Sequence, residues 1–161
     1  MADEEWSIYV VDEVRDWIYG LDKAARDRVA QAIDILAERG PRLGRPLVDS
    51  RRGRSIVTGY VRWTEIRGDL VEKAGGEEAF QRGKQELLAE VTGYRLAELR
   101  KKRRLTQQQV ADRMGVTKGR VSQIEKGKIS GQEVLARYAH ALGGQLQQAI
   151  LFDDGEIAGI A

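Results

Sequence analysis

The chain of 161 residues contains no cysteine and a single histidine, His140. Without cysteine it forms no disulfide, no thiolate metal site and no catalytic thiol. One histidine cannot build a metal cluster, and His140 lies in the helical pattern LARYAHALGG, where a packing or surface role is expected. The sequence therefore predicts neither a metal nor a cofactor, and its lack of thiols suits a reducing cytoplasm.

The sequence also has no apolar run of membrane-spanning length, and Met1 to Glu5 is acidic and polar, unlike a signal peptide. We therefore expect a cytoplasmic protein. Hydrophobic residues make up 42% of the chain and charged residues 32%, which is ordinary for one compact domain or two small ones.

Charge is unevenly distributed, since the whole chain carries a net +2 while the segment from Arg100 to Lys128 has ten basic and two acidic residues. A local positive patch is the electrostatic footprint of a surface that binds nucleic-acid phosphates. For Lys101 to Arg104, the plainer alternative is that these side chains complement the dipole at the end of a long helix.

The stretch LTQQQVADRMGVTKGRVSQIEKG, residues 105–127, predicts two short helices joined by a tight turn. Thr106 and Gln109 have the spacing of a capping box, so the first helix begins at Thr106. Gly115 ends it, and Thr117 is the N-cap of a second helix. The apolar positions Val110, Met114, Val116, Val121 and Ile124 have the spacing of an inward face.

Because Val121 and Ile124 face inward, the other side of the second helix is polar and basic. The stretch resembles the Cro/repressor-type (XRE) helix-turn-helix family, in the pattern LTQ..VA..MGV....VS.IE.G. The resemblance implies that Lys118, Gly119 and Gln123 face bases in the major groove. It also implies phosphate or groove-wall contacts from Arg104, Thr106, Gln107, Thr117, Arg120, Ser122 and Lys126. The alternative is a helical hairpin whose polar face is merely solvated.

The N-terminal part predicts a strand over Trp6 to Val11, a helix carrying Val14, Trp17, Ile18 and Leu21, and a second helix over 22–39. In this second helix Ala25, Val29, Ile33 and Leu36 are expected to face inward, and another strand is expected around 55–60. The pattern W.I.....V..WI..L....R..V..AI..L...G..LGRPLVDS resembles the front of a RelE-superfamily toxin of the HigB-like type. That family has a helical hairpin on a small antiparallel sheet and cleaves messenger RNA.

The toxin-like pattern ends at LVDS, and the strands that follow it in the toxin family are missing. The chain continues instead with VTGYVRWTEIRGDLVEKAGGEEAF, which resembles the beginning of the cognate antitoxin. With those strands missing, no catalytic residue can be assigned, and we expect no nuclease activity. The arginine-rich stretch RLGRPLVDSRRGRS, residues 42–55, is interpreted as a solvated segment, with contact to RNA or to an acidic partner as the alternative. Its arginines are Arg42, Arg45, Arg51, Arg52 and Arg54.

Helices are predicted over 63–73, with Ile66, Leu70 and Val71 on one side, and over 77–104, where Gly83 and Gly93 weaken the prediction of one continuous helix. The apolar residues of the longer helix are Phe80, Leu87, Leu88, Val91, Tyr94, Leu96 and Leu99. This stripe either packs on the chain's own N-terminal part, the preferred interpretation, or binds a toxin in trans.

After a helix over 132–142, with Val134, Leu135, Tyr138 and Leu142 available to the core, QLQQAILFDDGEIAGIA predicts a β-hairpin turning at Asp154-Gly155. Resemblance to antitoxins with such a hairpin implies pairing across a two-fold axis. The dimerisation residues would be Leu146, Ala149, Leu151, Phe152, Ile157 and Ile160. The alternative is a hairpin folded back on its own helices.

Taken together, the sequence predicts a mainly helical α+β chain with four parts: a truncated toxin-like segment (1–60), a helical connector (61–94), a helix-turn-helix domain (95–144) and a dimerising hairpin (145–161). The resemblance implies an antitoxin of the HigA type. Such a non-enzymatic homodimeric repressor would bind an inverted repeat in double-stranded DNA and have a HigB-type toxin as a possible partner. The alternatives are a toxin-neutralising interaction protein or an active messenger-RNA endoribonuclease.

Overall fold

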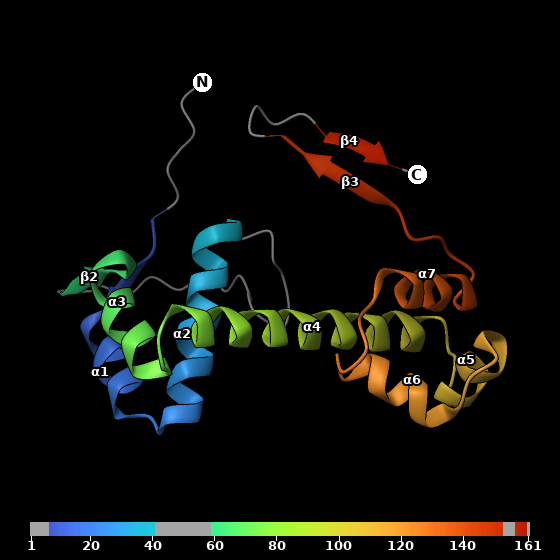
Figure 1. The fold of residues 1–161 in the computed structure, drawn as a ribbon, viewed down its shortest axis with the longest axis horizontal. Helices are drawn as coiled ribbons and strands as arrows, with labels where there is room; N and C mark the ends of the chain where they lie inside the picture. Colours follow the sequence, from blue (N-terminus) through green and yellow to red (C-terminus); the bar gives the residue numbers. More distant parts are fainter. Residues whose placement is uncertain (1–6, 41–58, 153–156, 161) are drawn as a thin grey trace. The chain divides into compact units, whose positions relative to one another are not determined.

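The computed structural model describes residues 7–40, 59–152 and 157–160, and helices dominate it (Figure 1). The chain divides into two compact units, residues 1–91 and residues 92–161, and a single long helix runs from the first into the second. The mainly helical α+β class is confirmed. In the described part, none of the helices combines the length and apolar character that a membrane span requires.

The first unit opens with a two-stranded antiparallel sheet, in which β1 (Tyr9–Val11) pairs with β2 (Tyr60–Arg62). Val10 and Val61 lie opposite each other and face the core, whereas the ring of Tyr9 stacks edge-on against Tyr60 on the exposed face. Of the strand predicted over Trp6 to Val11, the described residues from 7 onward form a strand only over Tyr9–Val11; of the one predicted around 55–60, Tyr60 lies in β2, which continues to Arg62. Residues 55–58 of that prediction lie outside the described part.

Helices α1 (Asp12–Gly20) and α2 (Lys23–Arg39) follow β1, and α3 (Trp63–Ala74) follows β2 directly. Asp22 begins α2 as an N-cap whose carboxylate accepts a hydrogen bond from the backbone N–H of Ala25 at 3.0 Å. The core joins strand, toxin-like and connector residues: Val10, Ile18, Ala30, Trp63, Ile66, Leu70, Val71 and Phe80. Self-packing of the apolar stripe predicted over residues 77–104 is confirmed for its first half, since Phe80 lies in this core and Leu87 lies in a smaller cluster with Ile35 of α2.

The inward face predicted for α1 needs correction, whereas the one predicted for α2 is confirmed at Val29 and Ile33 but is incomplete. In α1 only Ile18 is buried, while Val14 and Trp17 are 41% and 56% exposed. In α2 the predicted residues Ala25, Val29, Ile33 and Leu36 are half-buried, with Val29 and Ile33 packed against the main core and Leu36 against a smaller cluster. The fully buried positions of α2 are Ala30, Gln31, Asp34 and Ile35. The reason is that α2 is covered on two sides, whereas a stripe read from the sequence assumes one.

Helix α4 (Glu77–Lys102) is continuous through both of its glycines. Phe80, Leu87 and Val91 are buried as the stripe predicts, but Tyr94 and Leu99 are 46% and 49% exposed. A helix of this length packs different faces at its two ends, so a single stripe does not extend along all of it.

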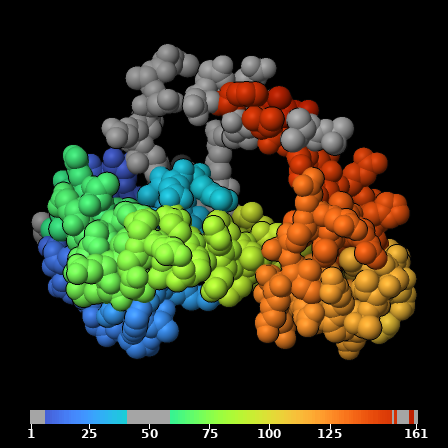
Figure 2. Space-filling model, viewed as in Figure 1, coloured from blue at the N-terminus to red at the C-terminus, as the bar shows by residue number. Residues whose placement is uncertain are grey.

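The second unit continues with α5 (Gln107–Met114), α6 (Lys118–Glu125) and α7 (Gln132–Ala141), which form one small body in the space-filling view (Figure 2). Its core contains Val110, Ala111, Met114, Val121, Ile124, Tyr138, Ala141 and Leu142, with Leu96 of α4 and Val116 packed against it. The inward positions predicted for the helix-turn-helix are confirmed by this core: Val110, Met114, Val116, Val121 and Ile124.

The chain ends in a hairpin of β3 (Gln148–Leu151) and β4 (Ile157–Ile160), paired antiparallel with Gln148 opposite Ile160. The predicted hairpin is therefore confirmed, although its turn at Asp154-Gly155 lies outside the described residues. The arginines of the stretch 42–55 also lie outside them: Arg42, Arg45, Arg51, Arg52 and Arg54.

Candidate DNA-binding face

The first helix of the pair, α5, is fixed at both ends by its own sequence. The hydroxyl of Thr106 accepts a hydrogen bond from the backbone N–H of Gln109 at 3.2 Å, and the Gln109 side-chain oxygen accepts one from the N–H of Thr106 at 2.8 Å. At the other end Gly115 adopts φ 64°, the left-handed region that glycine favours. The turn to α6 is therefore set by local chemistry.

Helix α6 begins at Thr117, whose hydroxyl accepts a hydrogen bond from the N–H of Arg120 at 3.2 Å. Its inward residues Val121 and Ile124 are 0% and 1% exposed. The predicted base-facing and phosphate-facing side chains are exposed at its start and along one side: Thr117, Lys118, Arg120, Gln123 and Lys126, with Ser122 half-buried. The structure thus brings them together on one outward face, which the described residues of the second unit leave exposed.

Gly119 lies in the first turn of this face with space around it. An ideal Cβ added there would have Thr117 Oγ1 as its nearest neighbour, at 3.8 Å, among the groups the structure contains. Packing within the protein therefore does not require a glycine at this position. Its lack of a side chain leaves the backbone open to close approach by a ligand.

The orientation of α6 is held by Glu125, a residue to which the sequence pattern gave no role. Its carboxylate accepts two hydrogen bonds from Arg100 of α4, at 2.6 and 3.0 Å, and a third from the Tyr138 hydroxyl of α7 at 2.6 Å. A fourth comes from the side-chain amide of Gln107 at 3.0 Å. One carboxylate therefore links α6 to three other helices, and the available signal was an acidic residue in a basic segment, directly after the inward-facing Ile124.

The network shifts the pKa values of its members. Burial alone would raise the pKa of Glu125, but the hydrogen bonds from Arg100, Tyr138 and Gln107 outweigh it and hold that pKa below 4.5. Burial, followed by the bond to the Glu125 carboxylate, raises the pKa of the Tyr138 hydroxyl. At neutral pH the network therefore contains an ionised carboxylate and a protonated phenol.

Three of the ten basic residues between Arg100 and Lys128 serve the fold. Arg100 is committed to Glu125, with its side chain 12% exposed. Arg103 and Arg113 donate to the carbonyl oxygens of Leu142 and Ala141, at 3.2 and 2.9 Å, where they complement the negative end of α7. The interpretation of all ten as a phosphate-binding footprint therefore needs correction for Arg100, whereas Arg103 and Arg113 are exposed and remain part of that prediction.

Arg104 is exposed just after α4, in an unusual conformation. Its φ of 57° lies in the left-handed region, and it is the one non-glycine residue of the described chain with a positive φ. The backbone N–H groups of Arg104 and Leu105 donate to the carbonyls of Lys101 and Arg100, respectively. These bonds end the helix in a way that usually places a glycine at the left-handed position. A left-handed backbone at arginine is strained, and such strain is typical of residues that have a functional role. A role for the Arg104 charge in DNA binding is consistent with it.

The hairpin side chains predicted to dimerise are exposed where they are described. Leu146, Ala149 and Phe152 face solvent, as does Ile150. The side chains of Leu151, Ile157 and Ile160 lie outside the described part. Among residues 7–40, 59–152 and 157–160 there is no group of His, Asp or Glu side chains arranged to hold a metal ion.

Comparison with known proteins agrees with this geometry. A family model described as helix-turn-helix matches residues 96–148. A protein of Mycobacterium tuberculosis (strain ATCC 25618 / H37Rv) named as antitoxin HigA2 is 42% identical over 79 residues, 48% of this chain and 78% of that protein. Another from the same organism, named as antitoxin HigA3, is 38% identical over 101 residues, 59% of this chain and 91% of that protein.

The chain belongs to the HigA antitoxin family. The family resemblance predicted from the helix-turn-helix pattern is confirmed.

The N-terminal part has a different relative. A protein of the same organism named as toxin HigB2 is 46% identical over 43 residues, 27% of this chain but only 21% of the toxin. This HigA-family chain therefore carries a short toxin-like segment in front of its antitoxin part, as the sequence pattern predicted.

Proposed function

We propose that this chain is a DNA-binding antitoxin-type repressor that reads its operator with the first two turns of α6. The observation that carries the proposal is the exposed polar and basic face from Thr117 to Gln123, on a helix whose opposite side is locked into the core by Val121 and Ile124. A rigid helix with exposed polar residues at its start is what the major groove accommodates.

Within this face we assign Lys118, Gly119 and Gln123 to base edges. Lysine donates to guanine acceptors, glutamine pairs with adenine, and glycine lets the backbone approach. The phosphate contacts are assigned to Arg104, Thr106, Gln107, Thr117, Arg120, Ser122 and Lys126. Because the Gln107 side-chain amide is bonded to Glu125, its contribution is the backbone N–H in the first turn of α5.

We propose that two copies bind together through the hairpin. A two-stranded hairpin alone is marginal in water, and Ile150 and Phe152 are 44% and 48% exposed. Pairing across a two-fold axis would bury these side chains and present two α6 helices to half-sites about 34 Å apart, one turn of the duplex. The operator would accordingly be an inverted repeat.

The four-part division predicted from the sequence fits this scheme, with the toxin-like segment acting as a remnant without nuclease activity. The match to HigB2 spans 21% of that toxin, so most of the toxin lies outside the matched segment. The relatives named as antitoxins support a HigB-type toxin as a partner.

Footprinting on DNA upstream of the gene tests the assignment. We expect protection of an inverted repeat, and Lys118→Ala with Gln123→Ala should reduce binding to the operator far more than binding to random DNA, at about 1–3 kcal/mol for each base contact. The matched control is Lys102→Ala, which removes an exposed charge of the same basic segment without an assigned base contact and should lower binding to operator and random DNA alike. Unchanged discrimination in the double variant would contradict the base-facing roles.

The dimer is tested separately by light scattering. The chain should have twice its monomer mass, and Phe152→Lys should shift it toward monomer because a charge cannot enter a dry interface without a partner. A monomer at all concentrations, or a dimer unaffected by Phe152→Lys and Ile150→Lys, would contradict pairing through the hairpin.

A further inference from the structure

Helix α2 is buried on two opposite faces. Val29, Ile33 and Ala37 pack into the main core of the first unit, which is the face expected of a toxin-like hairpin on its sheet. Gln31 and Ile35 lie two positions further along, about 200° around a helix that turns about 100° per residue, and they are also buried. This outer face needs its own partner.

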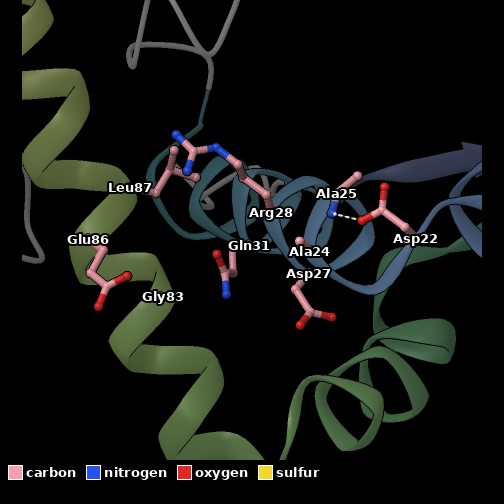
Figure 3. A pocket seen from close by; sticks show the side chains of 9 residues that line it. All are labelled: Asp22, Ala24, Ala25, Asp27, Arg28, Gln31, Gly83, Glu86 and Leu87. Carbon is pink, nitrogen blue, oxygen red and sulfur yellow. Dashed lines mark hydrogen bonds between the residues drawn. The ribbon is translucent and has the colours of Figure 1, made fainter.

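The partner is the first half of α4. Ile35 is 0% and Leu87 is 7% exposed, and together with Ala32, Leu36 and Leu88 they form a small cluster separate from the main core. Gln31 points from α2 to the turn of α4 that carries Gly83 (Figure 3). An ideal Cβ added to Gly83 would lie 2.0 Å from the Gln31 side-chain nitrogen, so the glycine allows the two helices to approach.

Charges across this contact are complementary. Lys84 of α4 is 3% exposed and donates to Asp34 of α2 at 2.8 Å and also to Glu38. At the other end of the contact Arg28 of α2 pairs with Glu90 of α4. A buried lysine needs such partners, because an unpaired charge in this place would be strongly unfavourable.

The contact opens on one side into a groove of about 470 Å³, lined by Asp22, Arg28, Gln31, Gly83, Glu86 and Leu87 among others (Figure 3). The contact between α2 and α4 thus has a small apolar cluster, a charged rim and an open edge. They are the features of a binding interface rather than of a single interdigitated core.

The two sides of the contact have different relatives. Helix α2 belongs to the N-terminal part that matches the toxin HigB2. The HigA3 match covers 59% of the chain. A continuous segment of more than half of the chain includes its middle wherever the segment begins, so the match includes residues 77–91 of α4. A toxin-like helix is therefore seated on an antitoxin helix within one chain.

We propose that the face of α4 formed by Gly83, Lys84, Leu87 and Glu90 is the docking surface for a HigB-type toxin, and that the chain's own α2 occupies it. The proposal rests on the antitoxin function proposed above and adds its regulation. The full chain takes up a separate toxin only when α2 is displaced, so the toxin-like segment acts as a built-in competitor.

Binding of purified HigB2 toxin to the full-length chain, measured by calorimetry, tests this. Ile35→Glu places a charge against Leu87 while leaving the inner face of α2 unchanged, and it should raise toxin affinity at least ten-fold. Adding Leu87→Glu on α4 should abolish that gain, because it damages the docking face itself. Arg39→Glu, an exposed change on the same helix outside the contact, is the matched control and should have no effect.

If Ile35→Glu disrupts the unit, as judged by circular dichroism, Arg28→Glu decides the question. Arg28 is exposed, and a glutamate there opposes Glu90, so a gain in toxin binding of two- to three-fold is expected. No gain in a folded variant, or equally tight binding by the unaltered chain, would overturn the proposal. Operator binding by the same preparations separates this outcome from failure of the repressor function, because the residues changed lie outside the helix-turn-helix.

Discussion

Gly93 of α4 and Glu125 of α6 are in backbone contact: an ideal Cβ added to Gly93 would lie 2.6 Å from the carbonyl oxygen of Glu125. It would also lie 2.6 Å from the backbone nitrogen of Gly127. The glycine in the middle of a long helix is thus the point at which the end of α6 rests on α4, and the carboxylate of the same Glu125 is tied to Arg100 two turns further along α4.

Gly93→Ala should destabilise the second unit. Alanine normally favours a helix by about 1 kcal/mol over glycine, but here the new methyl group meets backbone atoms that cannot rotate away. We expect a net loss of about 1–3 kcal/mol, the usual cost of overpacking, measured by urea denaturation with amide signals of α6 as the probe. A variant as stable as the parent chain would mean that α6 does not rest on Gly93.

Gly83→Ala is the informative comparison, because the group it meets is the Gln31 side-chain amide rather than backbone. A side chain can move, so the loss in stability should be smaller than for Gly93→Ala. Adding Gln31→Ala should remove the clash and leave the double variant more stable than Gly83→Ala alone. If the second substitution brings no recovery, the close approach of α2 to α4 at this turn is wrong.

The Glu125 network should give the second unit a defined acid limit. In the folded protein the pKa of Glu125 lies below its ordinary value of 4.5. The ionised carboxylate therefore contributes its full stabilisation above pH 4.5, and this stabilisation is lost as the pH falls through the folded pKa. Glu125→Gln should cost about 1.5–3 kcal/mol at neutral pH, the range for hydrogen bonds to charged groups, and should flatten the acid dependence. Stability measured against pH for both proteins checks this; an unchanged slope would exclude Glu125 as its source.

On the alkaline side the sign is reversed. The folded pKa of Tyr138 lies above the ordinary 10.0, so its contribution is complete below pH 10 and is lost as pH rises through the folded value. Tyr138→Phe should remove that loss, and absorbance of the phenolate should appear only with unfolding in the parent chain. Ionisation of this tyrosine at its ordinary pKa in the folded protein would contradict the buried bond to Glu125.

Gly119→Ala should separate folding from DNA binding. The structure leaves room for the methyl group and the residue is helical, so stability should rise by about 0.5–1 kcal/mol. Operator affinity should fall, because the methyl group obstructs close approach of a base or phosphate to the backbone. Denaturation and operator titration on one preparation measure both; retained affinity would remove Gly119 from the interface.

Arg104→Gly offers a second such separation. Glycine adopts the left-handed backbone at this position without the cost that arginine bears, so the variant should be at least as stable as the parent chain. Loss of the charge should weaken operator and random DNA alike and reduce the salt slope by about 1. Arg104→Lys is the control that keeps the charge. A variant that changed sequence preference instead would place Arg104 at a base.

The sequence by itself determined the features that depend on near neighbours. The capping box of Thr106 and Gln109, the left-handed Gly115, the cap at Thr117 and the inward pair Val121 and Ile124 each involve residues no more than four positions apart, so pattern and local chemistry suffice. The mosaic of a toxin-like start and an antitoxin-like continuation could be read in the same way, because it is a matter of sequence order.

Only the tertiary structure decided which residues meet across the chain. Arg100, counted in the sequence as a DNA-facing charge, is bound to Glu125 25 positions away, and Lys84 is buried against Asp34 50 positions away. The second buried face of α2 and the close helix contacts at Gly83 and Gly93 also involve residues that are distant in the sequence. Contacts between distant residues depend on how helices approach each other in space, and one sequence without its fold contains no local signal for that approach.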